Sequence, residues 1–222
     1  GVTGVANAIA MLGARYGSAK AVFLLGSWMQ TIQNAAYLAS AHLAAERGPF
    51  AQYNAAHHLQ TPSVRSLDPD VRATVEAHGL RNGTLTTIAP TGTISMLAGN
   101  VSSGIEPIFS TSFSRTITGP DGTKKTDRVM DYAAWAYRQT HGPDAPLPDS
   151  FVIASDLRPQ DHVAMQAAAQ NWVDSGISKT VNCPEDIPFD AFKDVYRAAY
   201  DAGCKGCTTY RPNAITGSIL SE

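Results

Sequence analysis

Near the start of the chain, apolar residues recur at intervals of three and four, which is the spacing of an amphipathic helix. The first such run covers residues 5–16, and we expect Gly17 to end it. Ser18 follows at once and can cap a second, much longer helix that continues to Gly48. The apolar stripe of this second helix consists of Val22, Leu25, Met29, Ile32, Ala36, Ala39 and Leu43.

This stripe has two explanations. Its regular three-four step is typical of a short coiled coil or a dimer helix. Two of its positions carry the small residue alanine, and this favours a helix that packs against its own domain. We therefore expect other parts of the same chain to cover the long helix, with the coiled coil as the alternative.

After the long helix, residues 48–66 contain two prolines and are expected to form a surface connection. Asp68 then precedes Pro69, which is the order of an N-cap and a first helical residue. Gly79 ends the helix that they begin. Residues 84–89 are rich in β-branched side chains and predict a strand.

The second half of the chain alternates helices with short strands. A strand at residues 110–118 is followed by a turn, and two further strands are expected at residues 178–182 and 207–211. The helical patterns cover residues 127–140, 160–174 and 189–202. Helices that connect strands suit parallel pairing. The sequence therefore predicts an α/β fold.

Composition narrows the class of protein. Of the 222 residues only 16% are charged, below the roughly 25% of an average domain, which suggests that this chain or another part of a larger protein covers much of its surface. The net charge of −2 gives no basic field for direct nucleic-acid binding. The longest apolar run, residues 21–29, is far shorter than the about 20 residues that span a membrane. Three cysteines and no secretory signal favour a cytoplasmic location.

The densest chemistry lies directly after the predicted strand at residues 84–89. The segment consists of Pro90, Thr91, Gly92, Thr93, Ile94 and Ser95, and a short helix is expected at residues 96–98. A turn from strand to helix presents free backbone N–H groups to an anion, and a glycine lets a phosphate approach closely. The segment has no lysine, so it is not the P-loop pattern. The alternative is a structural turn whose hydroxyls cap the short helix.

Two other features carry candidate chemistry. Glu106, fixed between Ile105 and Pro107, could act as a general base or bind a substrate hydroxyl. The alternatives are a solvated loop residue and a partner for an arginine. Cys204 and Cys207 form a Cys-x-x-Cys pair, which can bind zinc or run dithiol redox chemistry. Because a zinc site needs two more ligands, buried and inert thiols are the favoured interpretation.

Five segments together resemble a known family. They are His-Gly-Leu-Arg-Asn at residues 78–82, residues 89–95, Ser-Ser-Gly-Ile-Glu-Pro at 102–107, Ile-Ser-Lys-Thr-Val-Asn at 177–182 and residues 203–211. In this order they are similar to the large catalytic subunit of ribonucleotide reductases. The resemblance extends over nearly the whole chain.

Within that family the chain resembles the adenosylcobalamin-dependent branch. Relatives that receive a radical from a second subunit carry two adjacent tyrosines after the last long helix, and these positions fall on Thr208 and Thr209 here. Threonine cannot be oxidised at a biologically reachable potential, so a tyrosine relay cannot run through them. The resemblance therefore implies adenosylcobalamin as the cofactor of the full-length enzyme.

The resemblance implies a fold and a set of site residues. Residues 1–222 would form the C-terminal part of the catalytic domain and supply the second half of a ten-stranded α/β barrel, with long flanking helices. The segment from Pro90 to Ser95 would hold the phosphates of a ribonucleoside di- or triphosphate, and Asn82 and Glu106 would lie near that pocket. The reaction replaces the ribose 2′-hydroxyl by hydrogen through a cysteine thiyl radical.

The chain departs from the family in one respect. The family carries the thiyl cysteine in an Asn-x-Cys-x-Glu finger loop, and this chain has none, because Asn182-Cys183-Pro184-Glu185 has different spacing. We therefore expect a fragment that lacks catalytic residues and metal ligands, is inactive alone and needs the N-terminal remainder of the enzyme. A homodimer is a further expectation. The alternatives are a naturally split subunit that completes a partner's barrel and, less favoured, a zinc or dithiol module.

Overall fold

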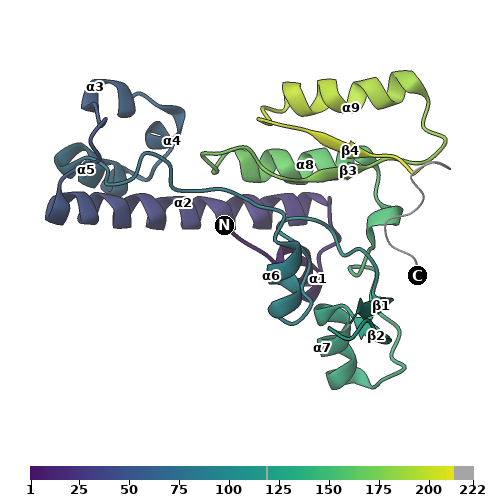
Figure 1. Cartoon of the computed structure of the whole chain (residues 1–222). Coiled ribbons are helices and arrows are strands. Elements are labelled where there is room, and N and C mark those ends of the chain that lie inside the picture. The colour runs from purple at the N-terminus through teal and green to yellow at the C-terminus, as the bar shows by residue number, and fades with distance from the viewer. Residues whose placement is uncertain (119, 213–222) are drawn as a thin grey trace.

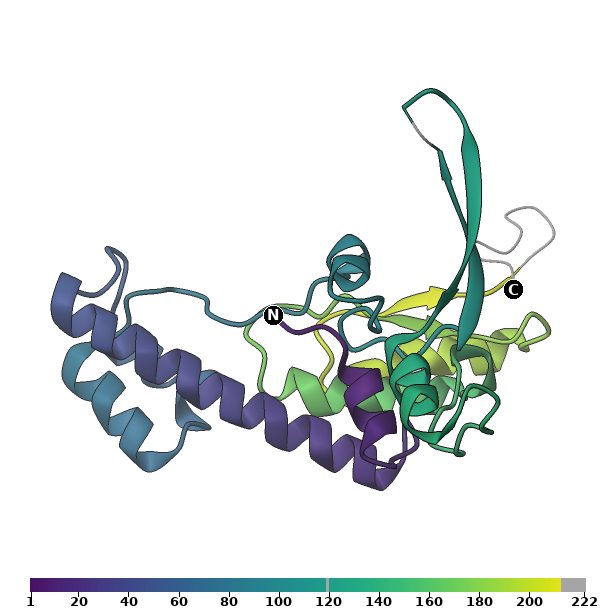
Figure 2. The same ribbon diagram turned by 90° about the horizontal axis from the view of Figure 1, so that it is seen from below.

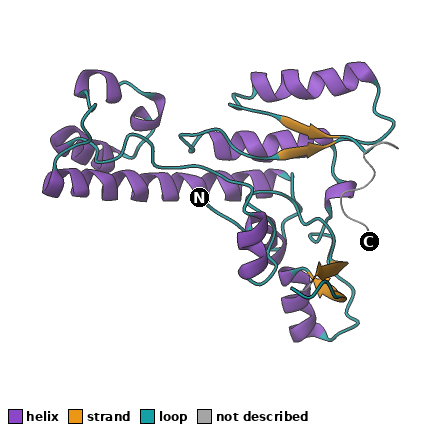
Figure 3. Cartoon of the chain, viewed as in Figure 1, coloured by secondary structure: helices purple, strands orange, loops and turns teal. Residues whose placement is uncertain are grey.

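The computed structural model describes residues 1–118 and 120–212 (Figure 1). Most of the ordered elements are helices, and the strands form two separate pairs (Figure 3). The helices are α1 (Val5–Met11), α2 (Ala19–Arg47), α3 (Ala55–His58), α4 (Pro62–Arg65), α5 (Pro69–His78), α6 (Gly92–Leu97), α7 (Tyr132–His141), α8 (Pro159–Gln170) and α9 (Phe189–Asp201), with a 3-10 turn at Ala154–Asp156. The strands are β1 (Ser112–Thr118), β2 (Lys124–Met130), β3 (Thr180–Asn182) and β4 (Thr208–Tyr210).

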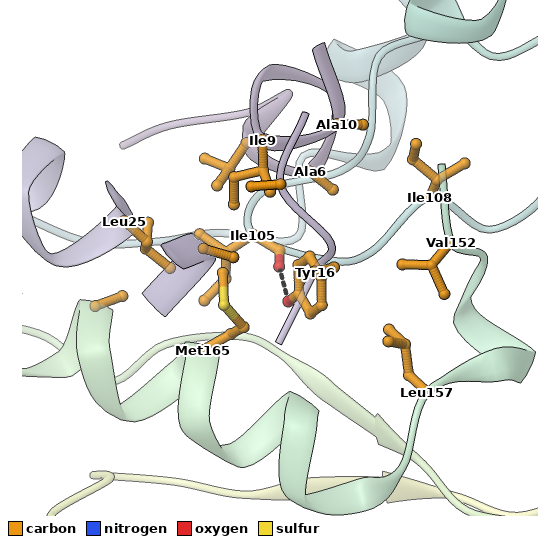
Figure 4. Close-up of a cluster of buried hydrophobic side chains, with 14 of the residues drawn as sticks. Ala6, Ile9, Ala10, Tyr16, Leu25, Ile105, Ile108, Val152, Leu157 and Met165 are labelled. Atoms are coloured by element: carbon orange, nitrogen blue, oxygen red, sulfur yellow. Dashed lines mark hydrogen bonds between the residues drawn. The ribbon is translucent and has the colours of Figure 1, made fainter. Parts of the chain in front are cut away.

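The first helix is shorter than its apolar spacing predicts. It ends at Met11, because Gly13 adopts a left-handed φ of 65° and its N–H bonds back to the carbonyl of Ala10. Tyr16 is therefore not on this helix. It lies in the following loop, where its ring is buried in the main core and its hydroxyl donates to the carbonyl of Ile105 (Figure 4).

The long helix α2 begins and ends as predicted, and other parts of the chain cover it. Ser18 caps it by accepting a hydrogen bond from the N–H of Ala21 at 3.2 Å. Its N-terminal half packs in the main core near α8, and its C-terminal half packs on α5 (Figure 1). The predicted stripe was wrong in the second half, where Ile32 and Leu43 are each 39% exposed. The buried face turns because the two halves contact different partners.

The region between α2 and the segment at residues 90–95 differs in part from the prediction. The surface connection contains two one-turn helices, α3 and α4. Asp68 is the N-cap of α5 with Pro69 at the first helical position, and Gly79 ends this helix. The side chain of Asp68 makes no capping bond, while its N–H donates to Asn34 of α2 at 2.9 Å.

Residues 84–89 are extended but form no strand, so this prediction was wrong. Their only ladder contact in the described part of the chain is a parallel bridge between Ile88 and Ile177. The carboxylate of Asp174 also holds the segment, because it accepts the N–H groups of Leu85 at 2.9 Å and Thr86 at 3.1 Å. Backbone pairing is limited to the carbonyls of Thr86 and Ile88, which accept the N–H groups of Ser175 at 3.1 Å and Ser178 at 2.9 Å, so the segment does not form the strand that β propensity predicts.

Strands β1 and β2 form an antiparallel hairpin that projects away from the rest of the molecule (Figure 2). The first strand agrees with the sequence. The predicted start of the next helix at residue 127 was wrong, because residues 124–130 pair with β1. The helix begins only at Tyr132, where Asp131 accepts the N–H groups of Ala133 and Ala134.

Strands β3 and β4 pair in parallel, and α9 connects them, as the sequence predicted. Val163 of α8, Val181 of β3, and Val195 and Ala199 of α9 form one buried cluster. The fold is therefore α/β. The described residues contain no closed barrel, so the ten-stranded barrel stays a prediction. None of the helices in this part of the chain is long and apolar enough to cross a membrane.

Candidate functional site

The segment from Pro90 to Ser95 is a tight turn followed directly by helix α6. The predicted turn was too long, because the helix begins at Gly92, and Thr91 is its N-cap with a left-handed φ of 54°. The N–H groups of residues 92–94 donate to no acceptor in the described part of the chain, and these three residues are exposed. Three adjacent unpaired amides at an exposed turn can bind an anion.

Hydrogen bonds hold Thr91 in its strained conformation. Its Oγ1 accepts the N–H of Gly104 at 2.7 Å, and its hydroxyl shares a 2.9 Å hydrogen bond with that of Thr3. Ser95 closes the other end, where its Oγ donates to the carbonyl of Gly92 and lies 3.1 Å from Oγ of Ser103. A left-handed threonine costs free energy, so such bonds are needed to keep it.

The loop at residues 102–106 packs against this turn and against the start of α1. Gly4, the N-cap of α1, has no side chain, and Oγ of Ser102 takes the cap's place by accepting the N–H groups of Ala6 and Asn7. Gly104 has a φ of 53°, and a Cβ there would lie 2.9 Å from the carbonyl oxygen of Ala89. Only glycine therefore allows the two segments to approach this closely.

Glu106 has internal partners for both carboxylate oxygens. Oε2 accepts from Nζ of Lys179 at 2.8 Å, and Oε1 accepts the N–H of Thr180 at 2.6 Å. The carboxylate therefore pairs with a cation, but the cation is a lysine and not the arginine that the alternative interpretation named. Its proximity to the turn comes through its backbone, because the N–H of Glu106 donates to the carbonyl of Ser103 at 2.7 Å.

Lys179 is fully buried and has a partner for each of its three N–H donors. Besides Glu106 it donates to the carbonyl of Thr180 and to Nδ1 of His162, each at 2.9 Å. Burial lowers the pKa of Lys179, while Glu106 raises it. Burial, and then the Lys179 charge, lower the pKa of His162 to about 3. His162 is thus neutral, with its proton on Nε2 because Nδ1 accepts.

Asn82 lies apart from this group. Its Oδ1 accepts from Oγ of Ser40 on α2 at 3.0 Å, and its N–H donates to the same Oγ at 3.1 Å. It belongs to the turn after α5, at the far end of the extended segment that leads to α6 (Figure 1). A role for Asn82 in substrate binding stays a prediction.

The three cysteines line the small core between α8, β3 and α9. Cys183 is buried, and Cys204 and Cys207 are half-buried. Burial raises the pKa of each thiol, although Lys179 partly lowers that of Cys207. Protonated thiols are poor nucleophiles. In residues 1–118 and 120–212 no group of three or more metal-ligating side chains is placed to hold an ion.

Sequence reasoning did not find Lys179, Thr3 or Ser103 as parts of this site. The motif at residues 177–182 contained Lys179 but suggested no role for it. Its contact with Glu106 joins residues 73 positions apart, and no local spacing reveals such a contact. A lysine within the short strand predicted at residues 178–182 is the one signal that could have identified it.

Comparison with known proteins assigns the chain to a family. Residues 1–210 match the model of the ribonucleotide reductase barrel domain. A vitamin B12-dependent ribonucleoside-diphosphate reductase of Mycobacterium tuberculosis is 34% identical over 238 residues, which cover 100% of this chain and 32% of the relative. The protein of the same name from Thermoplasma acidophilum is 34% identical over 237 residues, covering 100% of this chain and 29% of the relative.

A vitamin B12-dependent ribonucleotide reductase of Streptomyces coelicolor is 28% identical over 268 residues, which cover 98% of this chain and 28% of that protein. The chain thus spans about a third of the length of these curated relatives. It belongs to the ribonucleotide reductase barrel domain family. The family resemblance drawn from the five sequence segments is confirmed.

Proposed function

We propose that this chain is the C-terminal part of the catalytic barrel of a vitamin B12-dependent ribonucleotide reductase, which converts ribonucleotides to deoxyribonucleotides. Family membership and the names of the relatives support this activity. Two relatives are named as ribonucleoside-diphosphate reductases, so a ribonucleoside diphosphate is the first substrate to test. The missing finger loop would come from the N-terminal remainder of the enzyme, and a homodimer stays a prediction.

In this proposal Pro90 to Ser95 bind the substrate phosphates. The observation that carries it is the set of three exposed N–H groups at residues 92–94, which have no acceptor among the described residues. The hydroxyl of Thr93 adds a donor beside them, whereas those of Thr91 and Ser95 are occupied in shaping the turn. The backbone would thus supply most of the binding energy without a lysine.

Adenosylcobalamin would generate the radical chemistry in the full-length enzyme. The donors that this chain presents around residues 90–95 are amides and hydroxyls, which suit an anion rather than a corrin ring. We therefore assign no residue of this chain to cobalamin. The part that we assign to this chain is to bind and orient the phosphates, while the thiyl cysteine lies elsewhere.

The proposal includes inactivity of the isolated chain, because no Asn-x-Cys-x-Glu segment is present in it. The test is an assay of the 222-residue chain with a ribonucleoside diphosphate, adenosylcobalamin and a dithiol. Product above the enzyme-free blank would contradict this part of the proposal.

The phosphate site is tested by Gly92→Val in the intact reductase that carries this chain. A Cβ at Gly92 meets no atom of the described residues within 4 Å, so folding should be unaffected. The branched side chain would crowd a phosphate against the amides, and we expect the KM for CDP to rise about tenfold or more, about 1.4 kcal/mol. Gly176→Val is the matched control, because its Cβ is equally unobstructed and lies outside the turn. Unchanged KM in Gly92→Val would contradict the site.

A further inference from the structure

Lys179 is a buried cation whose position the fold alone does not explain. Its side chain is 0% exposed, while that of its partner Glu106 is 24% exposed. Removing two charges from water costs several kcal/mol, and apolar residues of similar volume often stabilise a fold equally well. A buried ion pair is therefore weak evidence of a stabilising role, and its value lies in what it orients.

The pair connects through the backbone to the proposed phosphate-binding turn. Glu106, held by Lys179, donates its N–H to the carbonyl of Ser103 at 2.7 Å. From this short loop, Gly104 donates to Oγ1 of Thr91, and Ser103 shares a hydrogen bond with Ser95. The loop thus contacts the turn at both ends. Tyr16 fixes the loop from a further side through its bond to the carbonyl of Ile105.

We propose that Lys179 is a positioning residue for the phosphate-binding turn. By holding Glu106 it fixes the loop at residues 103–106, and this loop keeps Thr91 left-handed. Thr91 in turn sets the direction of the N–H groups of residues 92–94. This inference rests on the proposed function, because it assumes that those amides bind the substrate phosphates.

The test is a double-mutant cycle in the intact reductase, with Lys179→Met, Glu106→Gln and the two combined. Each single change lowers the unfolding midpoint, because Lys179→Met leaves the carboxylate without its cation and Glu106→Gln leaves the ammonium without its anion. The combined variant recovers most of this midpoint, since no charge remains unpaired. Its KM for CDP nevertheless stays raised, about 3- to 30-fold, because the loop is no longer held.

The outcomes separate positioning from a purely structural role. If the combined variant recovers both the midpoint and the KM, Lys179 only stabilises the fold and the inference is wrong. If Gly92→Val raises the KM and the combined variant does not, the phosphate site stands and the positioning role fails. If Gly92→Val has no effect, the proposed site itself fails.

Two further variants accompany the double-mutant cycle, one as an independent test and one as a control. Ser103→Ala removes the contact with Ser95 and leaves the ion pair intact, so it applies even if the charge variants do not fold. We expect a rise in KM of about 2- to 3-fold without a change in the unfolding midpoint. An unchanged KM would contradict the proposed role of the loop at residues 103–106 in positioning the turn. The control is Lys193→Met with Asp190→Asn, an exposed pair on α9 that should change neither quantity.

Discussion

Glu106 and Asp174 are two carboxylates that hold neighbouring parts of the molecule in different ways. Asp174, just after α8, accepts the hydroxyl of Tyr37 at 2.6 Å and two backbone N–H groups of the extended segment. All these donors are neutral. Glu106 accepts one backbone N–H group and a buried ammonium. Neutral donors are therefore sufficient to hold an extended segment in this fold.

The difference between Asp174 and Glu106 indicates what the buried charge of Lys179 contributes. Burial alone would raise the pKa of Asp174, but hydrogen bonds from Tyr37, Leu85 and Thr86 outweigh it and lower the pKa. The carboxylate is thus satisfied without a cation. The ion pair of Glu106 and Lys179, in contrast, holds the loop that contacts the proposed phosphate-binding turn. In the proposal, phosphate binding at this turn depends on the position of each backbone amide.

The largest expected effect comes from Asp174→Asn compared with Glu106→Gln in the intact reductase. Asp174→Asn removes the negative charge that the hydroxyl of Tyr37 and the N–H groups of Leu85 and Thr86 share, and its NH2 group replaces the oxygen that accepts the Tyr37 hydroxyl. We expect the unfolding free energy to fall by about 2–3 kcal/mol. The KM for CDP should not change, whereas Glu106→Gln raises it. Denaturant unfolding and steady-state kinetics measure the two quantities. A raised KM in Asp174→Asn would remove the distinction between the two networks.

A smaller effect is expected on the pH dependence of stability, which differs in mild acid between the network around Lys179 and the one around Asp174. Because the pKa of His162 is about 3 in the fold and about 6.5 when unfolded, the unfolded state binds the extra proton as the pH falls below 6.5. Stability is then lost at up to about 1.4 kcal/mol per pH unit until the pH nears 3. Burial and Lys179 lower this pKa, while Asp161 opposes them. The contribution of Asp174 persists until the pH falls below about 4.

His162→Asn is the matched variant for this prediction, since asparagine offers Lys179 an acceptor but does not titrate in this range. Denaturant midpoints between about pH 7 and 4 should fall less steeply in the variant than in the unaltered protein. Parallel midpoint curves would show that His162 is not the group that responds.

Local signals predicted the ends of several elements. Ser18, Gly48 and Gly79 mark helix boundaries where the sequence placed them, because capping and left-handed glycine act within one turn. The parallel pairing of β3 and β4 also followed from their helical connection. These features depend on residues that are close in the sequence.

The predictions that were wrong concern residues whose partners are distant in the sequence. The buried face of α2 could not be read from its apolar stripe, because α8 and α5 contact different halves of the helix. Residues 84–89 have strand propensity but bond to Asp174. The role of Glu106 depended on Lys179, which is far away in the chain. The candidate turn itself was found from its composition, while the loop that supports it was not.

Hydrogen exchange of the amides at residues 92–94, in the intact reductase with and without saturating CDP, tests the central claim most directly. Unpaired and exposed amides exchange rapidly, and a bound phosphate should slow them. We predict slower exchange with CDP at these three amides and no change in the projecting strand β2. Equal rates with and without CDP at residues 92–94 would contradict the account.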